Sequence, residues 1–291
     1  MQDTKTAGQA MVTAPHHLAS AAGLSVLRDG GSAIEAAIAT AACLAAVYPH
    51  MTGIGGDGFW LISEPDGRLW TIDACGRSPL SLDAGLYAGM AEIPWRGPLA
   101  ANTVAGTVSG WALARASLSN PLPLERLLAD AIAHAENGVA VTAGGAELAA
   151  DKSAELRGLP GIYAETFEPD GRPLRAGEIL RQPRLAETLR ALGRDGLDSF
   201  YRGALAAQIA DDLAMLGSPL TAHDLAEHRA SSPEPLSVRL RDATLFNTAP
   251  PTQGLASLLI LPLYVGRMAN EADGVEHLHR LVECTKAAFR I

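Results

Sequence analysis

The feature that most constrains this chain is a run of small apolar residues that follows Ser32 and ends at Pro49. Ser32 and Glu35 have the spacing of a capping box, in which two side chains satisfy the first backbone N–H groups of a helix. The run AAIATAACLAAVYP that comes next is apolar on nearly every face of that helix. We therefore predict a helix that is buried all round, whose small side chains allow neighbouring backbone to approach closely.

A glycine-rich loop, GIGGDG at positions 53–58, comes directly after this helix. A dinucleotide site needs a strand before the glycines and a helix after them, so that the phosphates meet the N-terminus of a helix. Here the order is reversed, and Asp57 would place a negative charge beside the phosphates. We therefore interpret the loop as a tight helix-to-strand turn in which glycine allows a close backbone approach. This interpretation assigns no role to Asp57.

Periodicity and turn residues predict most of the remaining elements. We expect helices over 16–28, from near 108, over 122–138 and over the last residues, and strands over 59–63, 69–73 and within 236–254. No repeat or low-complexity linker offers a place to divide the chain. We therefore predict one α+β domain over residues 1–291.

Composition limits the partners of the chain. A hydrophobic content of 48% can fill a sizeable core, and a net charge of −9 argues against nucleic acid or an anionic membrane. The longest alanine-rich run, 36–48, is shorter than the roughly 18 to 20 residues that span a bilayer. The first residues lack an apolar secretory stretch. We expect a cytoplasmic protein with a small-molecule partner, without a nucleic-acid or membrane partner.

The residues favour no familiar hydrolytic or metal site. There is no GxSxG, and the pairs His16-His17 and His277-x-His279 belong to no HExxH pattern, so we expect no serine nucleophile, metal or cofactor. The three cysteines at 43, 75 and 284 are far apart, and we expect free thiols.

Two candidate site residues come directly after the second predicted strand. Cys75 follows that strand, where a reactive group could be exposed, although a free cysteine is more often a small buried hydrophobe. Arg77 could grip a small carboxylate with its guanidinium, or it could be a solvated arginine. The residues alone indicate an anion contact and go no further.

The order of segments along the chain resembles that of a known protein family. The stretch 11–62, from MVTAPHH to GIGGDGFWLI, resembles the N-terminal part of the γ-glutamyltranspeptidase family, with its double glycine, alanine-rich helix and glycine loop. The segments VAGTVSGW, LTAHDLAEH and HRLVECTKAAF follow in family order. The resemblance covers essentially all 291 residues.

This resemblance implies an N-terminal-nucleophile (Ntn) amidohydrolase, made as a precursor that cuts itself into a large and a small subunit. The expected fold is a four-layer αββα sandwich, and this chain is expected to be its helix-rich large subunit. The nucleophile would be the N-terminal threonine of the small subunit, so no catalytic residue is expected in this chain. The partner would be that small subunit, and whether two heterodimers pair is open.

One departure from the family pattern bears on the substrate. In γ-glutamyl transferases an arginine follows the ID motif and holds the glutamyl carboxylate, and the matching position here is Cys75. The strings IDACG and PPTQGLASLLIL are most similar to the branch that hydrolyses oxamate to oxalate and ammonia in purine-nitrogen recovery. Arg77, two positions further on, would contact the carboxylate. The alternatives are a γ-glutamyl transferase or hydrolase, a cephalosporin-type acylase, and a binding homologue without activity.

Overall fold

The computed structural model describes residues 5–266 and 274–290 and groups the chain into two compact units. Unit 1 comprises Met1–Asp57 and Gly76–Arg229, and unit 2 comprises Gly58–Cys75 and Ala230–Ile291. The expectation of one domain over residues 1–291 stays a prediction.

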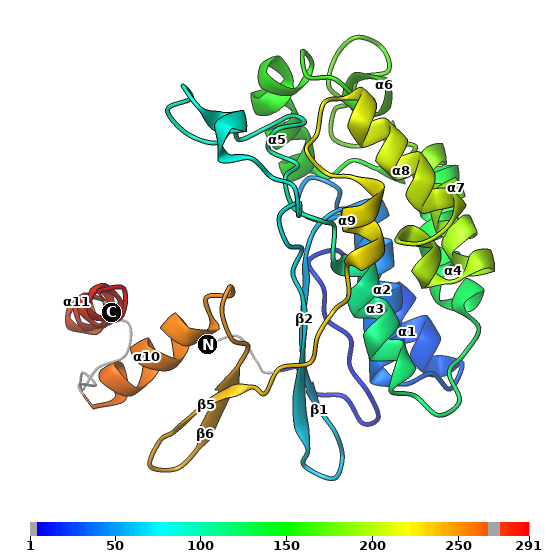
Figure 1. The fold of residues 1–291 in the computed structure, drawn as a ribbon. Coiled ribbons are helices and arrows are strands. Elements are labelled where there is room, and N and C mark those ends of the chain that lie inside the picture. The colour runs from blue at the N-terminus through cyan, green and yellow to red at the C-terminus, as the bar shows by residue number, and fades with distance from the viewer. Residues whose placement is uncertain (1–4, 267–273, 291) are drawn as a thin grey trace. The chain divides into compact units, whose positions relative to one another are not determined.

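Unit 1 contains most of the helices that the structure describes (Figure 1). Its elements are α1 (His17–Arg28), α2 (Ala33–Val47), η1 (Ala84–Tyr87), α3 (Thr107–Ala116), α4 (Leu124–Asn137), β3 (Val139–Ala140), α5 (Ala143–Leu156), α6 (Tyr163–Phe167), β4 (Ile179–Leu180), α7 (Pro183–Asp195), η2 (Leu197–Phe200), α8 (Ala204–Met215) and α9 (Ala222–Glu227).

The core of unit 1 lies around α2, which packs against α1, α3 and α4, while α7 packs on the other side of α4. The capping box forms as predicted, because Glu35 N–H donates to Ser32 Oγ and Ser32 N–H donates to Glu35 Oε2. Most residues of α2 are buried, with exposed Ala37 an exception. The predicted close approach is also found, because a Cβ at Gly23 of α1 would lie 2.2 Å from Thr40 Oγ1. Small residues thus bring α1 and α2 together.

The other predicted helices of unit 1 form close to their expected bounds. The helix expected over 16–28 is α1, and the one expected over 122–138 is α4, which ends at Gly138 with a φ of 92°. Glycine adopts this positive φ without the steric cost of a Cβ. The helix expected near 108 is α3.

The described residues of unit 2 form two hairpins and two helices. Its elements are β1 (Gly58–Ser63), β2 (Leu69–Ala74), β5 (Leu236–Arg239), β6 (Thr244–Asn247), α10 (Gly254–Val265) and α11 (Val275–Ala288). The antiparallel register pairs Gly58 with Ala74 and Ser63 with Leu69, as the predicted hairpin requires. Ser231 pairs with Asp73 by two backbone hydrogen bonds of 2.9 Å and so continues the hairpin. Residue 291 of the predicted last helix lies outside the described residues.

The strands of the described residues form only two-stranded antiparallel sheets, and helices dominate. The prediction of a helix-rich α+β chain is therefore confirmed. Within the described ranges, no helix is both long and apolar enough to cross a bilayer.

Candidate functional site

The two residues predicted to contact a substrate lie directly after β2. Cys75 is half-buried, and its N–H donates to Asp73 Oδ1 at 2.9 Å. Arg77 is exposed, and its carbonyl oxygen accepts a hydrogen bond of 3.0 Å from Val104 N–H. The guanidinium is thus accessible to an anion from solvent, whereas the thiol is partly covered. Their contacts with a substrate stay predictions.

Gly76, between these two residues, is fixed by the backbone that faces it. The residue is buried, and a Cβ added there would lie 1.5 Å from the carbonyl oxygen and 2.5 Å from the carbonyl carbon of Val104. No side chain can approach backbone so closely, so this position requires glycine. The backbone of Val104 therefore fixes the residue type at position 76.

Asp57 holds the same segment from the glycine loop. Its Oδ1 accepts the Gly76 N–H at 3.0 Å. Hydrogen bonds with a charged acceptor are stronger than neutral ones. The carboxylate to which sequence reasoning assigned no role therefore positions the backbone that leads to Arg77.

The glycine loop joins the N-terminus of α3. The carbonyl oxygen of Gly56 accepts from the N–H groups of Gly106 and Thr107, both at 2.8 Å. The Thr107 hydroxyl lies 2.9 Å from the same oxygen and 2.8 Å from the Asp57 carbonyl oxygen. N–H groups at the start of a helix are the ones that bind phosphates in nucleotide sites. Here the loop's own carbonyl occupies them, which agrees with the interpretation of the loop as a turn.

Space does not require glycine at three positions of this loop. A Cβ at Gly55 or Gly56 would meet nothing within 4 Å, and one at Gly53 would meet only Gly55 N at 4.0 Å. A backbone contact that leaves no room for a Cβ is found at Gly76, in the segment that Asp57 holds.

A buried polar cluster supports α3 behind this segment, and sequence reasoning missed it. Ser109 Oγ lies 2.7 Å from the Gly106 carbonyl oxygen, to which it donates, and 2.9 Å from His228 Nε2. The Tyr201 hydroxyl accepts the Ser109 N–H at 2.9 Å. Ser109 and His228 are 8% and 4% exposed, so the pair is not a solvent-accessible nucleophile and base. Burial raises the pKa of Tyr201 to about 12, and the cluster is a structural one.

A buried carboxylate, that of Asp224, anchors the chain beyond Arg77. Asp224 forms a capping box with Thr221 at the start of α9, and its Oδ1 also accepts the Leu80 N–H at 2.7 Å. Burial acts to raise the pKa of Asp224, but the hydrogen bonds from Thr221 and Leu80 outweigh it and keep the pKa below the ordinary value. The segment that carries Arg77 is thus held at Asp57, Val104 and Asp224.

The remaining candidates form no second reactive centre. Within the described residues, Cys43, Cys75 and Cys284 form no disulfide, as expected, and burial raises the pKa of Cys43 to about 12. The ring of His277 is hydrogen-bonded with the Tyr264 hydroxyl at 2.6 Å. Within residues 5–266 and 274–290, no group of three or more His, Cys, Asp or Glu side chains could hold a metal ion.

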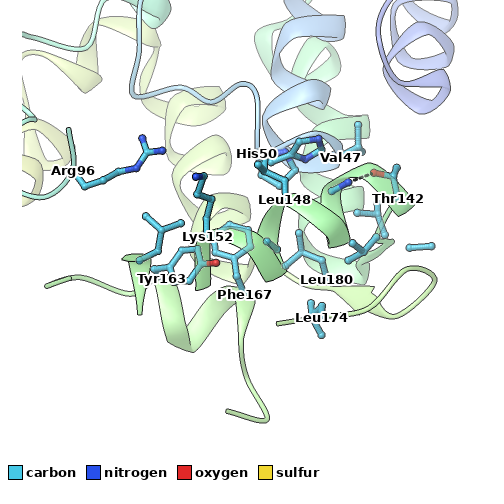
Figure 2. A pocket seen from close by; sticks show the side chains of 17 residues that line it. Val47, His50, Arg96, Thr142, Leu148, Lys152, Tyr163, Phe167, Leu174 and Leu180 are labelled. Carbon is cyan, nitrogen blue, oxygen red and sulfur yellow. Dashed lines mark hydrogen bonds between the residues drawn. The ribbon is translucent and has the colours of Figure 1, made fainter. Parts of the chain in front are cut away.

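A cavity of about 330 Å³ lies elsewhere in unit 1, among α5, α6 and the pair β3–β4 (Figure 2). Neither Asp57 nor Arg77 lines it. The cavity is therefore a feature distinct from the segment that Asp57 holds.

Comparison with known proteins gives consistent matches over the whole chain. The family model described as Gamma-glutamyltranspeptidase matches residues 19–291. The oxamate amidohydrolase proenzyme of Klebsiella pneumoniae is 50% identical over 295 residues, which cover 100% of this chain and 56% of that protein. The γ-glutamyltranspeptidase structure of Helicobacter pylori is 26% identical with a TM-score of 0.91 and covers 99% of this chain and 84% of the solved chain. A cephalosporin acylase structure from Bacillus halodurans is 33% identical with a TM-score of 0.87 and covers 99% of this chain and 57% of the solved chain.

Proposed function

Because the chain belongs to the γ-glutamyltranspeptidase family, we propose that it is the large-subunit part of an Ntn amidohydrolase that hydrolyses oxamate to oxalate and ammonia. The similarity to solved structures of the family confirms the predicted fold class, the helix-rich part of an Ntn-hydrolase sandwich. The chain spans about half the length of the curated relatives it matches. The activity proposed is that of the whole protein.

The observation that carries this proposal is the 50% identity, over the full chain, to a relative named oxamate amidohydrolase proenzyme. The position of Cys75 adds to it, because an arginine holds the glutamyl carboxylate there in γ-glutamyl transferases. A small acid amide does not need that contact. The exposed Arg77 offers a guanidinium for the single carboxylate of oxamate instead.

The proposed reaction uses a threonine at the N-terminus of the partner small subunit. Its hydroxyl oxygen attacks the amide carbonyl, while its own α-amine, with a pKa of about 8, accepts the hydroxyl proton. Backbone N–H groups hold the oxyanion, and ammonia leaves with a proton returned from the amine. Water then hydrolyses the oxalyl ester and releases oxalate. This chain would contribute the walls of the site and the carboxylate contact.

A partner subunit is supported by exposed apolar side chains on two elements of unit 2, α11 and β1. Val275, Leu278 and Val282 follow one another at helical spacing along α11, and they are 86%, 57% and 54% exposed. Phe59 and Leu61 are exposed on one face of β1. Apolar side chains gathered in this way mark surfaces that another protein covers. The small subunit of the same precursor is the partner we propose.

The location and assembly belong to the same proposal. Three free cysteines agree with a reducing compartment such as the cytoplasm. Purine-nitrogen recovery would be the source of oxamate, and pairing of two heterodimers would be seen as a doubled mass in solution.

The decisive experiment compares substrates. The purified precursor should separate into two bands on a denaturing gel and release ammonia from oxamate at a higher kcat/KM than it cleaves a γ-glutamyl anilide. A preference for the anilide would favour the γ-glutamyl transferase alternative, and turnover of a cephalosporin side chain would favour the acylase, whose solved relative is 33% identical. Unchanged oxamate hydrolysis after replacement of the small-subunit threonine would refute the mechanism. No hydrolysis by the processed protein would favour the binding homologue.

A further inference from the structure

The cavity between α5 and α6 is not lined by Cys75 or Arg77, the residues that we expect to contact the substrate. Its volume of about 330 Å³ falls within the roughly 300 to 1,000 Å³ of small-molecule pockets. All of its lining residues belong to unit 1, and they come from the end of α2, from β3 and β4, and from α5 and α6, with Arg96 at one side. The cavity therefore does not depend on how the two units are placed.

Its walls are mainly apolar. Aliphatic and aromatic side chains line most of it, among them Val47, Leu148, Leu156, Phe167 and Leu180. Leu148, Leu156 and Phe167 are only half-buried. A ligand with a hydrophobic body would complete their burial and gain free energy from it. Oxamate has no apolar group that these walls could cover.

The charged residues that line the cavity are all positive. Lys152 and Arg96 are its charged residues, and no Asp or Glu lines it. Their acidic partners lie outside the lining: Lys152 Nζ is 3.2 Å from Asp151 Oδ2, and Arg96 Nε is 3.2 Å from Glu155 Oε1. Figure 2 shows the nitrogen ends of both cations on the same side of the cavity. With side chains 39% and 47% exposed, each can offer further N–H groups to an anion.

Tyr163 adds a hydroxyl that is not satisfied within the described residues. Its Oη is buried and has no hydrogen-bond partner among them. Burial and the nearby Glu168 carboxylate raise the pKa of Tyr163, so the hydroxyl keeps its proton and can donate. A buried donor without an acceptor is unfavourable, and a polar atom of a ligand would relieve it. The cavity thus combines mainly apolar walls with two cations and a buried hydroxyl, and His50 and Thr142 add further polar groups to its lining.

We propose that this cavity binds a small amphipathic monocarboxylate, with its aliphatic or aryl body among Leu148, Phe167 and Leu180 and its carboxylate at Lys152 and Arg96. This site is separate from the segment that carries Arg77, and it goes beyond the proposed oxamate hydrolysis.

Calorimetric titration with sodium octanoate tests the site, because octanoate joins one carboxylate to an alkyl chain. The purified protein should bind one octanoate per chain and should bind octanol about fivefold to tenfold more weakly, as expected for a partly exposed ion pair. Lys152→Met keeps the apolar stem and removes the charge, so it should weaken octanoate about fivefold and leave octanol unchanged. Ala149→Phe places a ring in the cavity from α5 and should abolish both signals. Lys286→Met is the matched control, because Lys286 also pairs with a neighbouring acid, Glu283, but lies on α11.

Three results would overturn the proposal. The first is the absence of binding heat when millimolar octanoate is titrated into protein that circular dichroism shows to be folded. The second is equal affinity for wild type and Lys152→Met, which needs no large change of packing and so tests the site even if Ala149→Phe fails to fold. The third is a rise of the Michaelis constant for oxamate in saturating octanoate, which would place the probe in the reaction site instead. Since binding is measured directly, failure of oxamate hydrolysis would not affect this test.

Discussion

Replacing Gly76 with alanine is the sharpest test of how the chain holds Arg77. The added methyl group would lie 1.5 Å from the Val104 carbonyl oxygen and 2.9 Å from Val104 N. Both are backbone atoms, so no side-chain rotation can relieve the overlap. Either Gly76 or the segment at Val104 has to move by an ångström or more.

The cost can be estimated from the contacts that such a movement breaks. Overpacking of a closely packed site costs roughly 1 to 3 kcal/mol. The same movement strains the bond from Gly76 N–H to Asp57 and that from Val104 N–H to the Arg77 carbonyl, each of which contributes about 0.5 to 1.5 kcal/mol. We therefore expect Gly76→Ala to lower the free energy of unfolding by about 2 to 6 kcal/mol. A displacement of Arg77 by about 1 Å would also lower kcat/KM for oxamate by up to about 100-fold.

Gly55→Ala provides the matched control, because a Cβ at Gly55 meets nothing within 4 Å. It should change stability by no more than about 0.5 kcal/mol. Urea denaturation followed by tryptophan fluorescence reports on unit 1 through Trp111, which is 2% exposed. If the two alanine variants unfolded at the same urea concentration, the argument that Val104 leaves room only for glycine would be refuted.

Three further predictions concern the same region and the N-terminus of α1. Asp57→Ala removes the acceptor for Gly76 N–H and should raise the Michaelis constant for oxamate about twofold to tenfold. Asp57→Asn keeps an acceptor oxygen and should stay near wild type. Equal effects of the two variants would refute the positioning role of Asp57. Arg77→Ala should raise that constant roughly 10- to 100-fold with a smaller change in kcat, and an unchanged constant would remove Arg77 from the site. The pKa of His16 is lowered below 6.5 by burial and by the nearby His17, His134 and His50. The unfolded chain therefore binds the proton at a higher pH than the folded chain does. The free energy of unfolding should fall as pH falls below about 6.5. His16→Asn keeps a side-chain acceptor for Leu18 N–H and cannot titrate, so unfolding curves between about pH 5 and 7.5 should show a shallower pH dependence, and the same slope as wild type would refute this assignment.

The elements that could be predicted from the sequence are those whose signals are local. The capping box of Ser32 and Glu35, the apolar run of α2 and the glycine that ends α4 each act within a few residues. The hairpin of β1 and β2 is equally local, because its turn residues lie between the two strands. Short-range patterns of this kind need no knowledge of the tertiary fold.

The contacts that build the candidate site could not be predicted in this way. Asp57 meets Gly76 nineteen positions along the chain, and Ser109 meets His228 at a separation of 119. Neither pair has a spacing or a residue type that marks it, because any acceptor could hold a backbone N–H. The need for glycine at position 76 depends on Val104, which only the folded backbone brings near. For the same reason, the sequence could not show that space is open at Gly53, Gly55 and Gly56 but closed at Gly76.

The hydrogen bonds that backbone N–H groups already make limit how this region can bind an anion. In an anion site built on a glycine loop, backbone N–H groups at a helix N-terminus face the ligand. Here the N–H groups of Gly106 and Thr107 bind the Gly56 carbonyl, and that of Gly76 binds the Asp57 carboxylate. These backbone donors are committed to holding the loop and the segment after β2. We therefore expect the exposed guanidinium of Arg77, in that segment, to bind the carboxylate, and a variant that keeps the fold but removes this charge would separate recognition from architecture.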